Sequence, residues 1–304
     1  MTAGRLAPSP TGAQHLGNAR TYLIAYWAAR KAGHKVILRI EDVDSPRIKP
    51  WATQQAIDDL RWLGIQWDEG PDVGGPNAPY IQTERTASYQ RALKRLIEAD
   101  LVFPCTCTRK DIEAAGSAPH FEHESPIYPG TCSGWRNTDP LPPQGTYCWR
   151  FRASDREMEF DDAVSGRQVC NPSRDLGDFP ITQKTGASSY QLAVVVDDDA
   201  MGITEVVRGD DLIASTFRQM DLCHALGFQI PSYAHIPLVC GPDGRRLAKR
   251  HGDTRLSHLR DQGIPAERIV GWAKSSCQID HENEFDWQRL PKNRIILPSN
   301  DFRP

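Results

Sequence analysis

The first forty residues constrain the fold most, because their character changes in the order strand, turn, helix, strand. A short apolar segment around Leu6 precedes a turn of Pro, Ser and Gly at 8–12, and residues 35–40 are again apolar. Between them lies a helical pattern that ends at Gly33. The side chains that recur at helical spacing are Leu23, Tyr26, Trp27 and Arg30. Strands linked by a helix pair in parallel, so we predict an α/β fold with a parallel sheet.

The rest of the chain predicts further elements around an irregular middle segment. Residues 105–143 show no periodicity and are rich in Pro, Gly, Ser and His, which predicts an insertion into the sheet. Helical patterns are expected at 51–63, 83–99, 212–226, 256–261 and 265–275. Strands are expected at 147–151, 190–196 and 204–207, and a turn at 241–244.

Composition indicates a globular chain with no membrane segment. Its 304 residues are 39% apolar and 25% charged, which allows a sizeable core. The longest aliphatic run, 192–196, is far shorter than the roughly 20 apolar residues that span a membrane. The N-terminus does not resemble a secretory signal, so we expect a cytoplasmic location. With 36 basic and 39 acidic residues the formal charge is −3, so a nucleic-acid partner would need a local basic surface.

The turn between the first strand and the helix predicts an anion site. It reads Arg5-Leu-Ala-Pro-Ser-Pro-Thr-Gly12 and continues to His15-Leu-Gly-Asn18. Free N–H groups and the positive end of a helix dipole favour phosphate at such a junction, and small residues let a nucleotide approach the backbone. His15 and Asn18 can donate hydrogen bonds to phosphate oxygens. Taken alone, these residues also fit a Pro/Gly turn before a capped helix.

The whole string RLAPSPTGAQHLGNAR resembles the ATP-binding signature of class I aminoacyl-tRNA synthetases, in the form found in the glutamate and glutamine enzymes. The second landmark of that family is a KMSKS loop, and residues 246–250 read Arg-Leu-Ala-Lys-Arg in the expected order along the chain. Three positions depart from the family pattern, whereas the central Lys249 is present. Without the first motif, such a basic hairpin tip would fit a solvated surface. The resemblance implies a Rossmann-type parallel sheet with a zinc-binding insertion and a short, mostly helical C-terminal region.

The resemblance also implies how ATP is used. An amino-acid carboxylate attacks the α-phosphate and charge builds on the departing pyrophosphate, so positioning and electrostatics do most of the catalysis. Mg²⁺ is expected with the triphosphate. The implied catalytic residues are His15, Asn18 and Lys249. The implied ATP contacts are Pro8, Thr11, Gly12, His15, Gly17, Asn18, Arg246, Leu247, Ala248, Lys249 and Arg250.

Glutamate is the amino acid that the resemblance implies. Arginines bind carboxylates in bidentate fashion, and an acidic side chain offers an anion for the ammonium group. Without the family match, residues 41–44 would fit an acidic turn at a strand end, and residues 208–211 a loop ion pair. The implied glutamate contacts are Arg5, Ala7, Ser9, Glu41, Tyr190 and Arg208.

Eight cysteines in a chain without a secretory signal predict reduced thiols or a metal site. Cys105, Cys107 and Cys132 are spaced to suit a structural Zn²⁺, which takes four tetrahedral ligands. Candidates for the fourth ligand are Tyr128, His120, His123 and Cys148, and ordinary ligand preference favours His or Cys. A group of shortened glutamyl-tRNA synthetase relatives has Cys-x-Cys followed by Tyr-x-x-x-Cys, which implies Tyr128. A metal-free loop of buried thiols is the alternative.

Length separates the family members. An ordinary glutamyl-tRNA synthetase continues beyond its KMSKS loop into helical domains that read the anticodon, whereas only 54 residues follow Arg250 here. The chain therefore resembles the paralogues that lack the anticodon-binding domain and attach glutamate to the queuosine base of tRNA(Asp). That resemblance implies formation of glutamyl-adenylate without tRNA, followed by transfer of glutamate to queuosine. The expected partners are L-glutamate, ATP and tRNA(Asp) carrying queuosine, with a monomeric chain.

Other functions stay open at this point. A minimal glutamyl-tRNA synthetase would charge the tRNA 3′ end, and a non-catalytic paralogue would only bind tRNA. A general nucleotidylyltransferase has no evident use for residues 5–12 or for the cysteine-rich insertion. Candidate RNA contacts are Lys110, Arg136 and Arg255. The expected division of the chain is 1–104 and 181–240 for the two halves of the catalytic domain, 105–180 for the insertion, and 241–304 for the KMSKS-type loop and tail.

Overall fold

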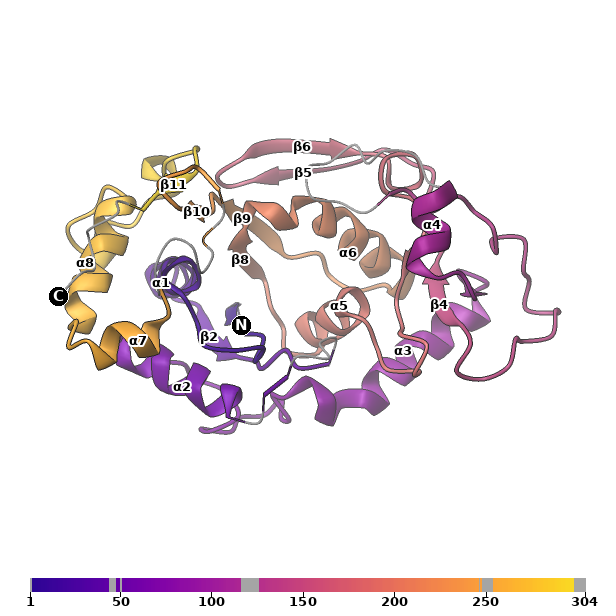
Figure 1. Cartoon of the computed structure of the whole chain (residues 1–304), viewed down its shortest axis with the longest axis horizontal. Coiled ribbons are helices and arrows are strands. Elements are labelled where there is room, and N and C mark those ends of the chain that lie inside the picture. The colour runs from indigo at the N-terminus through magenta and orange to yellow at the C-terminus, as the bar shows by residue number, and fades with distance from the viewer. Residues whose placement is uncertain are drawn as a thin grey trace.

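The computed structural model of the chain describes residues 2–43, 48–49, 51–115, 126–245, 247 and 254–297 (Figure 1). The helices are α1 (Leu16–Lys31), α2 (Ala52–Trp62), α3 (Thr86–Glu98), α4 (Arg109–Ala115), α5 (Tyr190–Ala200), α6 (Ile213–Leu226), α7 (Leu256–Asp261) and α8 (Ala266–Ser276). The strands are β1 (Ala3–Leu6), β2 (Lys35–Leu38), β3 (Val102–Cys105), β4 (Cys148–Phe151), β5 (Met158–Asp162), β6 (Gly166–Cys170), β7 (Phe179–Pro180), β8 (Glu205–Gly209), β9 (Ser232–Ile236), β10 (Val239–Cys240) and β11 (Ile295–Ile296). Short helical turns are η1 (Gln82–Arg85), η2 (Pro172–Leu176), η3 (Asp210–Leu212), η5 (Glu282–Glu284) and η6 (Trp287–Arg289).

Six strands form the main sheet, in the order β2-β1-β8-β9-β5-β6. Neighbours from β2 to β5 pair in parallel, and β6 turns back antiparallel on β5. Helix α1 connects the paired strands β1 and β2, which confirms the strand-helix-strand unit expected for the first forty residues. Because parallel strands end at the same edge of a sheet, the segments that follow β1, β2 and β8 meet there. That edge carries the candidate site.

Most other predicted elements are confirmed within a few residues. The helical patterns at 51–63, 83–99 and 212–226 correspond to α2, α3 and α6. The strand patterns at 147–151 and 204–207 correspond to β4 and β8, and the last two helical pieces are α7 and α8. None of the helices in the described ranges is long and apolar enough to cross a membrane.

The strand predicted at 190–196 is wrong, because this segment forms the first part of helix α5. The aliphatic run 192–196 is buried throughout, and α3 and α6 both pack against this helix. A helix buried on every side carries an unbroken apolar run, and periodicity alone does not separate it from a buried strand. Asp197 and Asp198, which follow the run, are also buried and pair with arginines.

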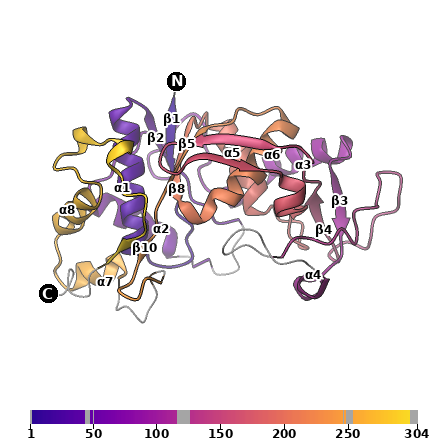
Figure 2. The same cartoon turned by 90° about the horizontal axis from the view of Figure 1, so that it is seen from above.

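The stretch predicted as an insertion, 105–180, contributes to two different sheets. Strands β3, β4 and β7 form a small antiparallel sheet in which Cys105 lies opposite Cys148. Strands β5 and β6, from the same stretch, extend the main sheet instead. Figures 1 and 2 place β4 and α4 at one end of the molecule and α7 and α8 at the other. The cysteine-rich segment is therefore tied to the main sheet through its own strands.

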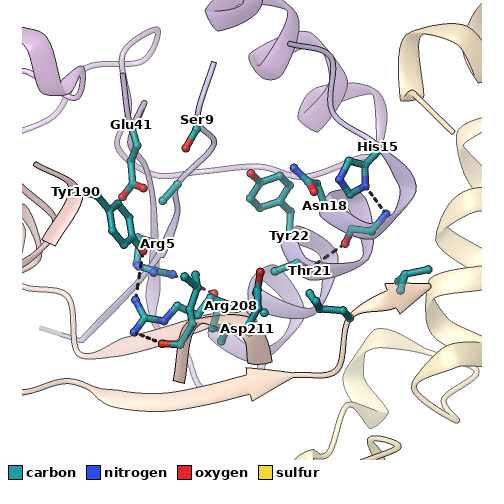
Figure 3. A pocket seen from close by; sticks show the side chains of 17 residues that line it. Arg5, Ser9, His15, Asn18, Thr21, Tyr22, Glu41, Tyr190, Arg208 and Asp211 are labelled. Carbon is teal, nitrogen blue, oxygen red and sulfur yellow. Dashed lines mark hydrogen bonds between the residues drawn. The ribbon is translucent and has the colours of Figure 1, made fainter. Parts of the chain in front are cut away.

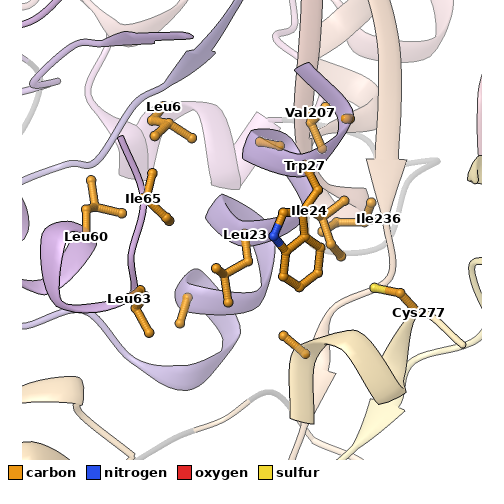
Figure 4. Close-up of a cluster of buried hydrophobic side chains, with 14 of the residues drawn as sticks. Leu6, Leu23, Ile24, Trp27, Leu60, Leu63, Ile65, Val207, Ile236 and Cys277 are labelled. Carbon is orange, nitrogen blue, oxygen red and sulfur yellow. The ribbon is translucent and has the colours of Figure 1, made fainter. Parts of the chain in front are cut away.

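The largest hydrophobic cluster surrounds α1 (Figure 4). Leu23, Ile24 and Trp27 of this helix share the cluster with Leu60 of α2, side chains of the main sheet and residues of α8. Full burial of one such side chain stabilises a fold by roughly 1.5–3 kcal/mol. Packing on several sides holds α1 in place, and with it the N-terminus of α1 at the sheet edge.

Candidate active site

A cavity of about 360 Å³ lies at the edge of the main sheet, beside the ends of β1, β2 and β8 (Figure 3). A cavity of this size suits a small polar ligand or part of a larger one. The lining includes all six residues implied for glutamate and three of those implied for ATP: Arg5, Ala7, Ser9, Glu41, Tyr190, Arg208, His15, Gly17 and Asn18. The fold thus brings two sets of residues that are far apart in sequence to one cavity.

Two buried arginines from adjacent strands lie at one end of this cavity (Figure 3). Arg5 of β1 is 6% exposed and Arg208 of β8 is 4% exposed. Arg208 donates to Gln219 Oε1 at 2.8 Å and to Thr216 Oγ1 at 2.6 Å. Within the described part of the chain, Arg208 hydrogen-bonds only to neutral groups and forms no ion pair. A buried cation in a cavity wall without an anionic partner indicates that the cavity binds an anion.

Glu41, three residues beyond β2, provides negative charge in the same cavity. Arg39 donates from Nη2 to Glu41 Oε1 at 2.9 Å, and the backbone N–H of Glu41 donates to the carbonyl of Pro8 at 3.0 Å. Burial raises the pKa of Glu41, and the cationic Arg39 and Arg5 oppose that rise. A bound ammonium group would favour the ionised carboxylate in the same way. This end of the cavity therefore offers cations for carboxylates and an anion for an amine.

The N-terminus of α1 forms the other end of the cavity. His15 occupies the cap position, and its Nδ1 accepts the backbone N–H of Gly17 at 3.1 Å. Asn18 Nδ2 donates to Gln14 Oε1 at 2.6 Å, and the first turn of the helix carries no acidic residue. The positive end of the helix dipole is therefore not neutralised by a side chain of its own first turn. This end of the cavity suits phosphate groups.

Residues on both sides of the second motif lie beside the first motif. Leu238 and Val239, which precede the turn at 241–244, line the cavity. After the motif, the backbone N–H of Leu16 donates to the carbonyl of Thr254 at 3.0 Å, and that of Leu256 to Gln14 at 2.8 Å. The segment before the second motif therefore lines the cavity, and the segment after it is hydrogen-bonded at the N-terminus of α1. This agrees with the expectation that the two motifs share one site.

Gly17 leaves room for the ring of His15. A Cβ atom on Gly17 would lie 3.0 Å from Cε1 and 3.1 Å from Nδ1 of that ring. We expect Gly17→Ala to displace His15 and to raise the KM for ATP by about 10- to 100-fold, because small displacements of positioning groups have large effects on rate. Measured KM values decide this, with Gly271→Ala on α8 as the control, since a Cβ there meets nothing within 4 Å. An unchanged KM for ATP would contradict the role of His15.

Some of the implied ATP residues do not line the cavity. Pro8 is buried and accepts the Glu41 N–H, Thr11 is exposed, and Gly12 lies in the same turn. Their contacts with ATP stay predictions. Leu247 is described and packs against the largest hydrophobic cluster. The remaining residues of the second motif lie outside the described residues: Arg246, Ala248, Lys249 and Arg250.

The cavity also contains residues that sequence reasoning missed. Tyr22 lies one helical turn after Asn18 on α1, and Asp211 follows β8. The spacing of Tyr22 from Asn18 was a usable signal, because residues four apart share a helix face. Thr216, Gln219 and His235, which contact Arg208, had no such signal, since their proximity depends on how α6 and β9 pack.

A second group of candidate functional residues lies at the small sheet. The Sγ atoms of Cys105, Cys107 and Cys132 all lie within 4.8 Å of one another, and no other such His, Cys, Asp or Glu group occurs among the described residues. Cys107 Sγ lies 3.7 Å from Cys132 Sγ and 3.9 Å from Tyr128 Oη, which lies 3.5 Å from Cys105 Sγ. Zn–S and Zn–O bond lengths of about 2.3 and 2.0–2.2 Å place tetrahedral ligand atoms roughly 3.5–3.8 Å apart. These four side chains therefore fit Zn²⁺.

The other candidates for a fourth ligand differ in position. Cys148 lies opposite Cys105 in the small sheet, but it is not part of the three-cysteine group. Its Sγ atom is 3.7 Å from the carbonyl oxygen of Cys105. His120 and His123 lie outside the described residues. Among the candidates that the structure describes, the geometry favours Tyr128.

Comparison with known proteins identifies the family of the chain. A family model described as the catalytic domain of class I tRNA synthetases (E and Q) matches residues 2–285. A glutamyl-Q tRNA(Asp) synthetase of Rhodopirellula baltica is 60% identical, over 98% of this chain and 96% of that protein. The protein of the same name from Symbiobacterium thermophilum is 46% identical over 98% and 97%. The chain belongs to the glutamyl-Q tRNA(Asp) synthetases, within the class I tRNA synthetases of the E and Q type.

Ordinary glutamate enzymes are more distant relatives. A glutamate–tRNA ligase of an Anaeromyxobacter species is 41% identical over 90% of this chain but only 58% of that protein. The crystal structure of the glutamate-tRNA synthetase of Elizabethkingia anophelis superposes with a TM-score of 0.83 at 28% identity, over 99% of this chain and 68% of that one. The fold expected from the sequence is thereby confirmed. The protein is a ligase whose catalytic domain is of the type that activates glutamate with ATP and Mg²⁺ and transfers it to tRNA.

Proposed function

We propose that this synthetase activates glutamate without tRNA and then attaches it to the queuosine base of tRNA(Asp). One observation carries the first half: a single cavity has Arg208, which forms no ion pair with any described residue, beside Arg5 and Glu41 at one end, and the N-terminus of α1 at the other. The first end suits the two carboxylates and the ammonium of glutamate, and the second suits the phosphates of ATP. The names of the relatives matched over nearly their whole length support queuosine as the acceptor.

In the first step, an oxygen of the glutamate α-carboxylate forms a bond to the α-phosphorus of ATP. The bond from that phosphorus to the bridging oxygen breaks, and pyrophosphate leaves with the electron pair. Arg5, Arg208 and Glu41 hold the glutamate, while His15 and Asn18 meet the phosphate charge at the helix N-terminus. We assign Lys249 to the departing pyrophosphate. Mg²⁺, brought with the triphosphate, neutralises phosphate charge.

In the second step, a hydroxyl of the queuosine cyclopentenediol attacks the carbonyl carbon of the glutamyl group. The bond from that carbon to the bridging oxygen of the adenylate breaks, AMP leaves with the electron pair, and the hydroxyl proton passes to solvent water. The adenylate is a high-energy acyl donor, so orientation of the hydroxyl supplies much of the rate. Lys110, Arg136 and Arg255 are exposed, and we propose them as contacts of the RNA backbone. Because the acceptor is a mature tRNA, we place the enzyme in the cytoplasm.

Glutamate-dependent ATP–pyrophosphate exchange in the absence of tRNA tests the first half. We expect exchange with glutamate and none with glutamine or aspartate. No exchange without tRNA, but exchange after tRNA(Glu) is added, would favour a minimal glutamyl-tRNA synthetase. No exchange in either case, together with tight binding of tRNA, would favour a non-catalytic paralogue.

The position of labelled glutamate tests the second half. After reaction with tRNA(Asp) that carries queuosine, we expect label in the anticodon fragment produced by nuclease digestion. Matched tRNA(Asp) with guanosine in place of queuosine should accept none. Label at the 3′-terminal adenosine would contradict the proposed acceptor.

A structural Zn²⁺ held by Cys105, Cys107, Tyr128 and Cys132 is part of the proposal. Zn²⁺ bound by four side chains would cross-link the loop to the end of β3. We expect one Zn²⁺ per purified chain, lost in Cys107→Ser and at least tenfold more weakly bound in Tyr128→Phe. Cys148→Ser should keep its metal, because Cys148 is outside the group. Metal content by mass spectrometry decides this. A zinc-free, fully active wild type would contradict the site. Loss of zinc in Cys148→Ser but not in Tyr128→Phe would replace Tyr128 by Cys148 as the fourth ligand.

A further inference from the structure

His235 and Asp162 lie behind Arg208, and no sequence motif singles out either of them. His235 of β9 is paired in register with Arg208 of β8, and Asp162 ends the neighbouring strand β5. The side chains of His235 and Asp162 are fully buried, with 0% exposure in each case. Three adjacent strands of the main sheet thus bring Asp162, His235 and Arg208 together.

The carboxylate of Asp162 accepts hydrogen bonds from several N–H groups. It accepts His235 Nδ1 at 2.7 Å and the backbone N–H groups of His235, Val164 and Ser165 at 2.8–3.1 Å. Burial opposes ionisation, but the bonds from His235 and Ser165 hold the pKa of Asp162 below its ordinary value. An ionised carboxylate only accepts, so the proton of this contact belongs to His235 Nδ1.

The other ring nitrogen of His235 faces the substrate arginine. Arg208 Nε lies 3.1 Å from His235 Nε2, and a guanidinium only donates, so Nε2 must present its lone pair. The pKa of His235 is lowered to about 4, because burial and the nearby Arg208 and Arg5 lower it more than Asp162 raises it. Thr216 Oγ1, 3.0 Å from Nε2, is the remaining polar contact of the ring. His235 is therefore a neutral imidazole with its proton on Nδ1.

This arrangement determines the direction in which Arg208 points. Its Nε–H is used by His235, and its strongest Nη contacts go to Gln219 and Thr216. The contacts to Tyr190 Oη and the Leu212 carbonyl are long, at 3.4 Å each. A carboxylate entering the cavity would replace those two contacts with bidentate bonds to Nη1 and Nη2.

We propose that Asp162 and His235 are positioning residues for glutamate recognition, which lock Arg208 so that its two Nη groups meet a substrate carboxylate. The inference rests on the proposed role of Arg208 in binding glutamate. Asp162 fixes the tautomer of His235, and His235 then accepts from Arg208 in the only orientation that leaves the Nη edge toward the cavity. A protonated ring, or one with its proton on Nε2, would direct an N–H group at Arg208 Nε–H and turn the guanidinium away.

Two substitutions of His235 distinguish its hydrogen bond to Asp162 from its hydrogen bond to Arg208. Asn places a donor near the position of Nδ1 but has no acceptor that reaches Arg208, whereas Gln can place its oxygen near the position of Nε2. We expect His235→Asn to raise the KM for glutamate about 10- to 100-fold, the usual range for a lost hydrogen bond to a charged group, with an unchanged KM for ATP. His235→Gln should restore most of the affinity. His224→Asn, an exposed histidine on α6, is the matched control.

Glutamate-dependent pyrophosphate exchange measures the KM values, and calorimetry measures glutamate binding without ATP. An unchanged KM for glutamate in His235→Asn, or an equal loss in both His235 variants, overturns the inference while the proposed function stands. Absence of glutamate binding and exchange in the wild type overturns the proposed function itself. Spectra of the wild-type protein supply a further readout, with His235→Gln used only to assign the signal. Long-range ¹H–¹⁵N spectra should show a neutral, Nδ1-protonated ring for the histidine whose signal disappears in His235→Gln. A charged or Nε2-protonated ring would contradict the inference.

Discussion

Replacing Arg208 by methionine should nearly abolish glutamate activation and leave the fold intact. Arg208 is buried, has no anionic partner among the described residues, and lines the cavity. Its removal leaves the substrate carboxylate without its cation, and loss of one partner of a buried charge pair costs roughly 2–5 kcal/mol. We therefore expect kcat/KM for glutamate to fall by about 10²- to 10³-fold.

The same substitution should change the free energy of unfolding by only about 1–2 kcal/mol. It removes a buried charge, which is favourable, but it leaves the acceptors of Gln219 and Thr216 without their donor. Exchange kinetics and chemical denaturation of the same preparation decide the question. Arg208→Lys should recover only part of the activity, because an ammonium lacks the planar fork. Arg91→Met, on the exposed face of α3, is the control. Full activity in Arg208→Met would overturn the assigned glutamate site.

Replacing Arg39 by methionine should instead cause a large loss of stability. Arg39 is fully buried and donates to Asp198 Oδ1 at 2.7 Å and to Glu41 Oε1 at 2.9 Å, with Asp197 Oδ2 at 3.8 Å. These carboxylates raise the pKa of Arg39 despite the opposing effect of its burial. Removal of one partner from a buried ion pair costs about 3–5 kcal/mol, because the other charge stays buried without compensation.

Urea denaturation of Arg39→Met against the wild type measures this effect. Arg85→Met offers a graded comparison, since Asp197 keeps contacts with Gln82 and Tyr89 when Arg85 is lost. We expect the order of stability to be wild type, then Arg85→Met, then Arg39→Met. Equal stability of Arg39→Met and wild type would show that the three carboxylates are not ionised together. Two buried arginines that look alike in sequence are thus expected to differ in role: Arg208 binds the ligand, and Arg39 stabilises the fold.

The local sequence was sufficient to predict the first strand-helix-strand unit with its turn, and a group of three cysteines. In each case the signal lies within a few residues of the chain. Pro, Gly and Ser in the turn at 8–12, the helical spacing up to Gly33 and the Cys-x-Cys at 105–107 all depend on short-range geometry. The family resemblance added the six glutamate contacts, and the fold brings them all to one cavity.

Tertiary structure decided the rest, because the remaining properties depend on which distant segments touch. Helix α5 has the apolar run of a strand, and only its burial on all sides explains that run. Sheet register placed His235 beside Arg208, and the packing of α5 brought Asp198 within reach of Arg39. A sequence reports each residue's own chemistry and its local spacing. Long-range packing decides whether a buried arginine faces a carboxylate, a histidine or an open cavity. This environment in turn determines whether the arginine binds substrate or stabilises the fold.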